Sequence, residues 1–229
     1  MSQIEEEKVL AAKFALERIP SDARVVGLGS GSTVAAFVRE LAKSDIARRL
    51  TFVPASSQIE EEALAAGLRL SDLDHVEAVD FTVDGADEVD PELNLLKGGG
   101  GALTREKILA VHSDLYVIIA DHTKPVEALC SRHPLPVEVV KFGRSHTAKL
   151  LAEALDGEVA LRKTRFGIPF ITDNGNYILD VKLKEPISDP EATLNQLKSI
   201  PGVVEVGLFV GLADEVYVAE GREVRVLTP

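Results

Sequence analysis

A run of four glycines between a lysine and an arginine–glutamate pair is the segment of this sequence best suited to chemistry. It reads Lys97-Gly98-Gly99-Gly100-Gly101-Ala102-Leu103-Thr104-Arg105-Glu106. Glycine tolerates positive φ and leaves backbone N–H groups exposed, so a small polar ligand can lie on this loop. Lys97 can stabilise negative charge on a substrate oxygen, and Glu106 can abstract a proton from carbon if burial raises its pKa. A flexible linker is the alternative, but linkers seldom separate a strand from a helix within a compact domain.

A second candidate ligand loop is Gly29-Ser30-Gly31-Ser32-Thr33, which follows a predicted strand and opens a predicted helix. The first N–H groups of a helix lack partners and carry partial positive charge, so this loop predicts a phosphate-binding cradle. A dinucleotide-binding fingerprint is a competing interpretation, but Ser32 stands where its third glycine is required. A tight turn with a serine or threonine cap is the simplest alternative.

Acidic residues follow another apolar segment, in the sequence Asp84-Gly85-Ala86-Asp87-Glu88-Val89-Asp90. Open α/β sheets bind ligands at the carboxyl ends of their strands, so we expect Asp84 and Asp87 to face one cleft. There they can accept hydrogen bonds from sugar hydroxyls or act as a general base. Glu88 and Asp90 are expected on an acidic surface turn. The spacing does not match a calcium-binding loop, and no two histidines have metal-ligand spacing, so no metal is predicted.

A fourth polar segment, Ala120-Asp121-His122-Thr123-Lys124, also follows an apolar strand. Lys124 is a candidate phosphate partner because its ammonium group is a compact point charge. His122 is either an acid–base group or, more simply, a structural or solvated histidine.

Composition restricts the class of protein further. The chain has 229 residues and a formal net charge of −12, which disfavours a nucleic-acid partner because its field repels phosphate backbones. It contains no apolar run of the roughly 20 residues that a membrane span needs, and its first residues do not resemble a signal peptide. Cys130 is the single cysteine, so no intrachain disulfide is possible. These features predict a soluble cytoplasmic protein without a membrane partner.

Strands and helices alternate through the first half of the chain. Helices are predicted over residues 3–19, 34–43, 58–66 and 103–112, and strands over 23–28, 51–55, 79–84 and 115–120. Such alternation predicts an α/β fold with a doubly wound, mostly parallel sheet.

The pattern changes after about residue 133. A strand is predicted over 135–140, a helix over 145–155, a hairpin over 171–183 and a helix over 190–198. The hairpin turn is placed at Asn174-Gly175, a dipeptide that favours type I′ turns. This order predicts a second, smaller α+β domain over residues 135–203, with residues 1–134 plus 204–229 forming the main domain.

Taken together, these segments resemble the type A ribose-5-phosphate isomerases. The resemblance rests on residues 29–33, 84–88, 97–106, 120–124, 135–140, 172–180 and 200–209, and so extends over nearly the whole chain. It implies an aldose–ketose isomerase that interconverts D-ribose 5-phosphate and D-ribulose 5-phosphate through an enediolate, in the pentose phosphate pathway. It also implies no metal or organic cofactor, a ferredoxin-like lid for the smaller domain, and assembly into a homodimer or homotetramer.

The resemblance also implies roles for individual residues. Glu106 matches the catalytic acid–base, Asp84 the group that assists ring opening, and Lys97 the residue that stabilises the enediolate oxygens. The substrate-binding positions that it implies are Ser30, Gly31, Ser32, Thr33, Asp84, Gly85, Ala86, Asp87, Lys97, Gly98, Gly99, Gly100 and Lys124.

Two other functions are kept as alternatives. One is a non-catalytic sugar-phosphate sensor, which needs the phosphate loop but not Glu106. The other is a related sugar-phosphate deaminase or lactonase. The sequence also departs from the family pattern at Ile59, where a threonine is usual.

Overall fold

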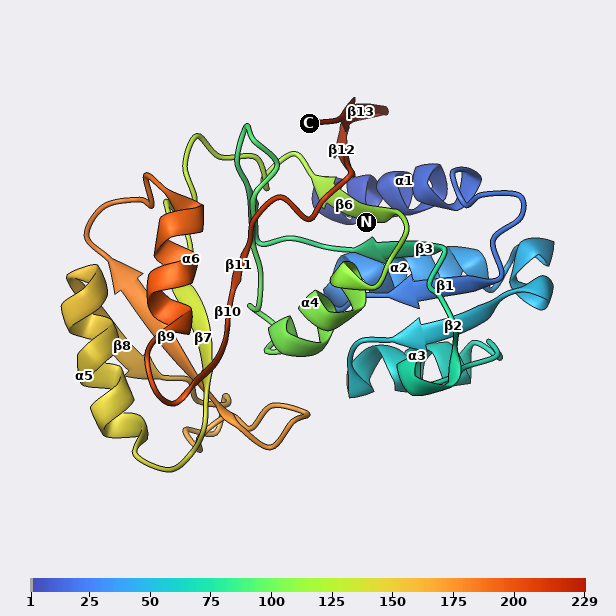
Figure 1. The fold of residues 1–229 in the computed structure, drawn as a ribbon. Helices are drawn as coiled ribbons and strands as arrows, with labels where there is room; N and C mark the ends of the chain where they lie inside the picture. The colour runs from blue at the N-terminus through green and yellow to red at the C-terminus, as the bar shows by residue number, and fades with distance from the viewer. Residues whose placement is uncertain (1) are drawn as a thin grey trace. The chain divides into compact units, whose positions relative to one another are not determined.

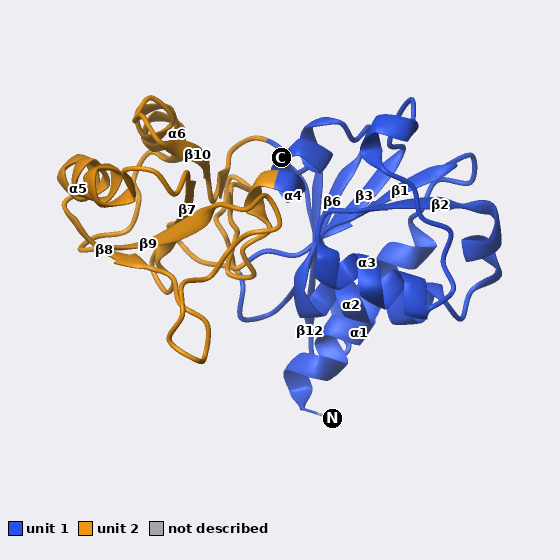
Figure 2. Cartoon of the chain, turned by 90° about the horizontal axis from the view of Figure 1, so that it is seen from below, with its two compact units in different colours: residues 1–86, 105–124, 212–229 blue, residues 87–104, 125–211 orange. Residues whose placement is uncertain are grey.

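The computed structural model describes residues 2–229, which form two compact units (Figure 2). Unit 1 comprises the chain up to residue 86 together with residues 105–124 and 212–229, and unit 2 comprises residues 87–104 and 125–211. The smaller domain predicted over 135–203 lies within unit 2. Its boundaries as an independent lid stay a prediction.

Unit 1 is built on a six-stranded sheet (Figure 1). Its strands are β1 (Val25–Leu28), β2 (Thr51–Pro54), β3 (Phe81–Asp84), β6 (Tyr116–Asp121), β12 (Glu215–Glu220) and β13 (Glu223–Leu227). They lie in the order β13-β12-β6-β3-β1-β2, and every neighbouring pair is parallel except β12 and β13. The predicted α/β fold with a mostly parallel sheet is confirmed.

The strand order reverses direction between β1 and β3. From β1 the chain adds β2 on one side, and from β3 it adds β6 and then β12 on the other. The carboxyl ends of β1 and β3 meet there, and the Gly29 N–H donates to the Val83 carbonyl at 2.9 Å. This reversal is the position at which doubly wound sheets bind ligands.

Helices cover both faces of this sheet. They are α1 (Gln3–Glu17), α2 (Gly31–Leu41), α3 (Ser57–Ala65) and α4 (Leu103–Val111), with short 3-10 turns at Asp45–Arg49 and Leu73–His75. The first three share one apolar core, in which Ala11, Phe37 and Ile59 are fully buried together with strand residues. Leu109 of α4 packs in a separate cluster with Val53. Throughout residues 2–229, each helix is too short or too polar to cross a lipid bilayer.

Unit 2 has a four-stranded antiparallel sheet with two helices. In chain order its elements are β7 (Leu135–Val139), α5 (Arg144–Leu155), β8 (Gly157–Leu161), β9 (Tyr177–Leu183), α6 (Pro190–Lys198) and β10 (Val203–Val206). The strand order β10-β7-β9-β8 gives the βαββαβ topology of ferredoxin-like folds. A second, three-stranded sheet consists of β11 (Leu208–Phe209), β5 (Leu95–Leu96) and β4 (Glu88–Val89), and the glycine run follows β5.

Two predictions about unit 2 were wrong. The hairpin over residues 171–183 has only an isolated bridge between Ile171 and Tyr177 as its first arm, because β9 pairs instead with β8, which was not predicted. Glu88 and Asp90 are buried, not on a surface turn. One Glu88 oxygen accepts the N–H groups of residues 132 and 133, and Asp90 accepts the N–H of residue 94.

Candidate active site

The loop between β1 and α2 combines backbone N–H groups with hydroxyls. Ser30 is the extended residue that precedes α2, its side chain makes no capping bond, and Gly31 has a φ of 86°. The Ser30 hydroxyl lies 3.2 Å from that of Ser56, and the Lys8 ammonium group lies 3.0 Å from the Ser32 hydroxyl. A helix N-terminus with hydroxyls and an ammonium group suits a phosphate monoester. The long-range contact of Lys8 has no local signature in the sequence.

Asp84, the last residue of β3, is held firmly at the reversal point. Its side chain is fully buried. One oxygen accepts the N–H of Ser30 at 3.2 Å and that of Gly85 at 2.7 Å, and the other accepts the Tyr116 hydroxyl at 2.9 Å. A Cβ atom on Gly29 would lie 2.0 Å from the Asp84 carboxyl carbon, so only glycine fits beside it. The strand end, the loop and β6 therefore fix this carboxylate together.

Glu106 lies in the first turn of α4, and its side chain is 5% exposed. It belongs to the same unit as Asp84, and both carboxyl groups act on the pKa of Tyr116. Burial raises the pKa of the Tyr116 phenol well above its ordinary value, and the charges of Asp84 and Glu106 raise it further. Tyr116 therefore stays protonated and donates to Asp84. In the sequence, Tyr116 is simply one residue of an apolar strand, because aromatic residues are typical of buried strands.

Lys97 follows β5 in unit 2, and Asp87 precedes β4, its partner strand. The Asp87 N–H donates to the Leu96 carbonyl at 2.8 Å, and one Asp87 carboxylate oxygen accepts the Gly99 N–H at 2.8 Å. Lys97 is 3% exposed, and its ammonium group lies 5.4 Å from the centre of the Phe209 ring. The two short strands therefore place Asp87 beside the start of the glycine run.

The glycine run forms a tight turn. The Gly101 N–H donates to the Gly98 carbonyl at 3.0 Å, and these two residues have φ values of 83° and 103°. Residues with side chains rarely adopt such angles, which explains glycine at both ends of the turn. Gly99 and Gly100 lie between them and are exposed, and the Gly99 N–H is the one that donates to Asp87.

A buried carboxylate holds the far end of this loop. Glu138 of β7 is fully buried and accepts a hydrogen bond from the Thr104 hydroxyl. It also accepts bonds from Thr172 at 2.9 Å, Asn174 at 3.2 Å and Asn176 at 2.9 Å. This network explains the polar residues of the segment 172–176 as structural rather than ligand-binding.

Lys124 follows β6, the strand next to β3, so it lies at the same edge of the sheet as Asp84. Its N–H donates to the Asp121 carbonyl at 3.1 Å. Nearby, His122 Nδ1 lies 2.5 Å from a carboxylate oxygen of the buried Glu7. This hydrogen bond raises the pKa of His122, and despite burial it lowers that of Glu7, together with the Gly221 N–H, to about 2.

The same pair belongs to the one group of side chains in residues 2–229 with ligand atoms close enough to share a metal ion. In Glu7, Asp121 and His122 these atoms lie within 4.8 Å of one another. The short His122–Glu7 hydrogen bond engages two of the three ligands as an ion pair, because each partner favours the charged form of the other. The geometry fits an ion pair better than a metal site.

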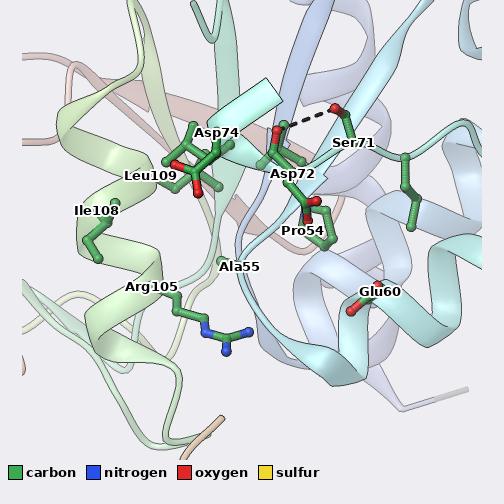
Figure 3. A pocket seen from close by; sticks show the side chains of 12 residues that line it. Pro54, Ala55, Glu60, Ser71, Asp72, Asp74, Arg105, Ile108 and Leu109 are labelled. Carbon is green, nitrogen blue, oxygen red and sulfur yellow. Dashed lines mark hydrogen bonds between the residues drawn. The ribbon is translucent and has the colours of Figure 1, made fainter. Parts of the chain in front are cut away.

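A pocket of about 530 Å³ in unit 1 is lined in part by α4 (Figure 3). Arg105 projects into it from α4, and Glu60, Asp72 and Asp74 also line it. Three carboxylates against one guanidinium disfavour an anionic sugar phosphate. No residue of the predicted site lines this pocket. α4 thus directs the partly buried Arg105 into this pocket and buries the adjacent Glu106.

The structure brings the predicted residues together in two groups. Unit 1 contains the loop 29–33, Asp84 to Ala86, Glu106 and Lys124, and unit 2 contains Asp87 and the segment 97–100. Ile59, in place of the usual threonine, is fully buried in the apolar core, and the Ser56 side chain accepts its N–H. Fold and site together define a doubly wound α/β protein with an anion-binding loop beside buried carboxylates.

Comparisons with known proteins specify the family. Residues 51–223 match the family described as ribose 5-phosphate isomerase A (phosphoriboisomerase A). The chain is 54% identical to ribose-5-phosphate isomerase A of Korarchaeum cryptofilum, over 98% of each chain. It is 45% identical to the protein of that name from Bradyrhizobium diazoefficiens, over 95% of this chain and 93% of the relative.

Solved structures agree with this assignment. A D-ribose-5-phosphate isomerase in complex with phospho-erythronic acid is 39% identical, with a TM-score of 0.93 over 100% of both chains. Ribose 5-phosphate isomerase A from Methanocaldococcus jannaschii is 37% identical, with a TM-score of 0.91 over 98% of this chain and 99% of that one. The chain belongs to the ribose 5-phosphate isomerase A family.

Proposed function

We propose that this chain interconverts D-ribose 5-phosphate and D-ribulose 5-phosphate through an enediolate, as an enzyme of the pentose phosphate pathway. The observation that carries the proposal is the pairing in unit 1 of two buried carboxyl groups, Asp84 and Glu106, with an amide-rich loop. An aldose–ketose isomerisation needs a mobile base and an anchor for the remote phosphate, and this arrangement supplies both.

Glu106 is proposed to carry the proton between C2 and C1. Its burial at 5% exposure removes it from bulk water, which favours a base that must take a proton from carbon and return it to the neighbouring carbon. Asp84 is proposed to assist ring opening by transferring the proton of the C1 hydroxyl to the ring oxygen as the bond between C1 and that oxygen breaks. Its fixed orientation, set by Ser30, Gly85 and Tyr116, suits a group that must meet one substrate atom.

Lys97 and Asp87 are proposed to bind the reacting end of the sugar. The Lys97 ammonium group would stabilise negative charge on the enediolate oxygens, and Asp87 would accept hydrogen bonds from sugar hydroxyls. Gly85, Ala86 and residues 98–100 would contact the substrate through their backbone.

The phosphate group is proposed to bind at the loop 29–33 and Lys124. The α2 N-terminus, the hydroxyls of Ser30, Ser32 and Thr33, and nearby ammonium groups supply local positive potential. This local potential is needed because the net charge of the chain is −12. Binding energy gained at the phosphate can then orient the distant carbon atoms.

Incubation with ribose 5-phosphate alone tests the proposed function. We expect ribulose 5-phosphate to form without added cofactor, and pre-treatment with EDTA to leave the rate unchanged. Saturable binding without turnover would favour the sugar-phosphate sensor, and release of ammonia from an amino-sugar phosphate would favour the deaminase. Activity that is lost with EDTA and restored by a divalent ion would contradict the metal-free reaction.

A homodimer or homotetramer in the cytoplasm is proposed from the family resemblance. Light scattering after size-exclusion chromatography measures the assembly directly. A monomer at assay concentration with full activity would contradict it.

A further inference from the structure

Arg162, which follows β8 in unit 2, has no role in the function proposed above, yet it contacts the glycine turn. Its guanidinium group is paired with Asp180 of β9. Nε donates to one Asp180 oxygen at 2.9 Å and Nη2 donates to the other. The two side chains are only 14% and 21% exposed. A two-point pair of this kind fixes the plane of the guanidinium group as well as its position.

The remaining nitrogen of Arg162 binds the backbone of the turn. Nη1 donates to the Gly98 carbonyl at 2.6 Å and to the Gly99 carbonyl at 3.0 Å. Two consecutive peptide groups therefore point their oxygen atoms toward one fixed cation. Asp180 already balances the charge of Arg162. The hydrogen bonds to the two carbonyls therefore have a further effect, which is to orient the peptide groups of the turn.

The orientation of these carbonyls determines where the N–H groups point. In a planar trans peptide the C=O and N–H bonds point in opposite directions. The peptide between Gly98 and Gly99 shows this directly, because its oxygen meets Arg162 while its N–H donates to Asp87 at 2.8 Å. The peptide between Gly99 and Gly100 has its oxygen on Arg162 as well, so the Gly100 N–H points away from Arg162, toward the side occupied by the Asp87 carboxylate.

Phe170, which is hydrogen-bonded to the backbone of Arg162, contacts the turn at a second point. The Phe170 N–H donates to the Arg162 carbonyl at 2.9 Å. A Cβ atom on Gly101 would lie 2.4 Å from the Phe170 ring, so the ring lies flush against this glycine. Glycines alone would leave the turn flexible. Arg162 and Phe170 restrict it to one conformation.

We propose that Arg162 is a positioning residue for the isomerisation, which holds the glycine turn so that the Gly100 N–H faces the bound sugar and the Gly99 N–H stays on Asp87. The Gly100 N–H then donates to an oxygen of the enediolate as negative charge develops there, and the Gly99 N–H orients Asp87. The inference rests on the proposed function. Donors that are fixed before the reaction need no reorganisation during it.

Kinetics of Arg162→Ala and Arg162→Lys test this role. Removing a preorganised donor costs roughly 10²–10³ in kcat, so we expect a loss of about 10- to 100-fold for a residue that acts through the donor, with KM within about threefold. Arg162→Lys keeps the positive charge but lacks the planar guanidinium, which can bind Asp180 and the turn at the same time. Its kcat is expected to lie between those of Arg162→Ala and wild type. Asp180→Asn is expected to show the same pattern as Arg162→Lys. Arg165→Ala removes an exposed arginine of the same segment and serves as the control.

Two binding measurements distinguish positioning from general damage. Affinity for a four-carbon sugar-acid phosphate, whose planar carboxylate resembles the enediolate, is expected to fall by the same factor as kcat. Affinity for inorganic phosphate, which needs only the loop of unit 1, is expected to remain within twofold of wild type. Guanidinium ion in the assay is expected to restore part of the kcat of Arg162→Ala.

Several outcomes would overturn the inference. The first is a kcat for both Arg162 variants that equals the kcat of Arg165→Ala. The second is a rise in KM with unchanged kcat. The third is an equal loss of affinity for the sugar-acid phosphate and for inorganic phosphate. If Arg162→Ala does not fold, Arg162→Lys alone decides by the same criteria. Lack of turnover by the wild-type protein would overturn the proposed function and this inference together, whereas an active wild type with insensitive variants contradicts the inference alone.

Discussion

Asp84 in unit 1 and Asp87 in unit 2 are only three residues apart in the chain, but they are held in different ways. Asp84 ends a buried strand, is fully buried itself, and accepts bonds from two backbone N–H groups and the Tyr116 hydroxyl. Asp87 is half-buried, lies outside a two-residue strand, and accepts the Gly99 N–H. The parallel sheet fixes one carboxylate in place, whereas the other depends on a glycine turn that other residues hold.

Each of these carboxylates also excludes a side chain from a neighbouring glycine. A Cβ atom on Gly29 would lie 2.0 Å from the Asp84 carboxyl carbon, and one on Gly99 would lie 2.8 Å from an Asp87 oxygen. The first carboxylate cannot move, because donors on both its oxygens hold it. The second is the end of a flexible side chain. The sheet therefore tolerates no change around Asp84, whereas beside the glycine turn the Asp87 side chain itself can move aside.

Gly29→Ala is expected to have the largest effect. The new methyl group must displace Asp84 or the backbone, which costs about 1–3 kcal/mol of unfolding free energy. A reacting group misplaced by about 1 Å can cost about 100-fold in rate, so we expect at least that loss of kcat. Urea denaturation and the isomerase assay measure the two effects. Wild-type activity in this variant would show that Asp84 is mobile.

Gly99→Ala is expected to be milder. The Asp87 carboxylate can rotate away from the methyl group, which removes one hydrogen bond worth about 1 kcal/mol, so we expect kcat/KM to fall about fivefold. Stability should change little. A loss as large as that of Gly29→Ala would remove the distinction between the two carboxylates.

Tyr116→Phe sharpens the comparison within unit 1. It removes the hydroxyl donor of Asp84 and leaves a buried carboxylate oxygen with one bond fewer, which costs about 1–3 kcal/mol of stability. The Ser30 and Gly85 N–H groups still orient Asp84, so kcat should fall less than tenfold. A fall comparable to that of Gly29→Ala would make Tyr116 a participant in the reaction.

The smallest expected effect concerns the Glu7–His122 ion pair and pH. The pKa of Glu7 is lowered to about 2, so its stabilising contribution is complete above its ordinary value of 4.5 and is lost as the pH falls toward 2. The pKa of His122 is raised, so its contribution is complete below 6.5 and is lost as the pH rises through the raised value. The charges of the nearby Asp121 and Glu220 also raise the pKa of His122.

The destabilisation by His122→Ala should therefore be largest between about pH 4.5 and 6.5. Thermal unfolding at several pH values measures it, with His146→Ala, which removes an exposed histidine of α5, as the control. A destabilisation that does not depend on pH would contradict the ion pair.

Sequence reasoning predicted the parts of the site that have local signatures. Glycine and serine between a strand and a helix indicated the loop 29–33, and acidic residues after an apolar strand indicated Asp84 and Asp87. Tyr116, Lys8 and Arg162 have no such signature, because their importance comes from contacts with residues that are distant in the chain. The burial of Glu88 could not be predicted for the same reason, since the N–H groups of residues 132 and 133 bind it.

The central claim, that Glu106 moves the proton, is tested most directly by Glu106→Gln. This variant keeps the shape of the side chain, so the affinity for a sugar-acid phosphate should remain within about threefold of wild type. Loss of a general acid–base group should lower kcat by about 10²- to 10⁴-fold. The exposed Glu61→Gln is the control. Turnover within tenfold of wild type, with binding retained, would contradict the account.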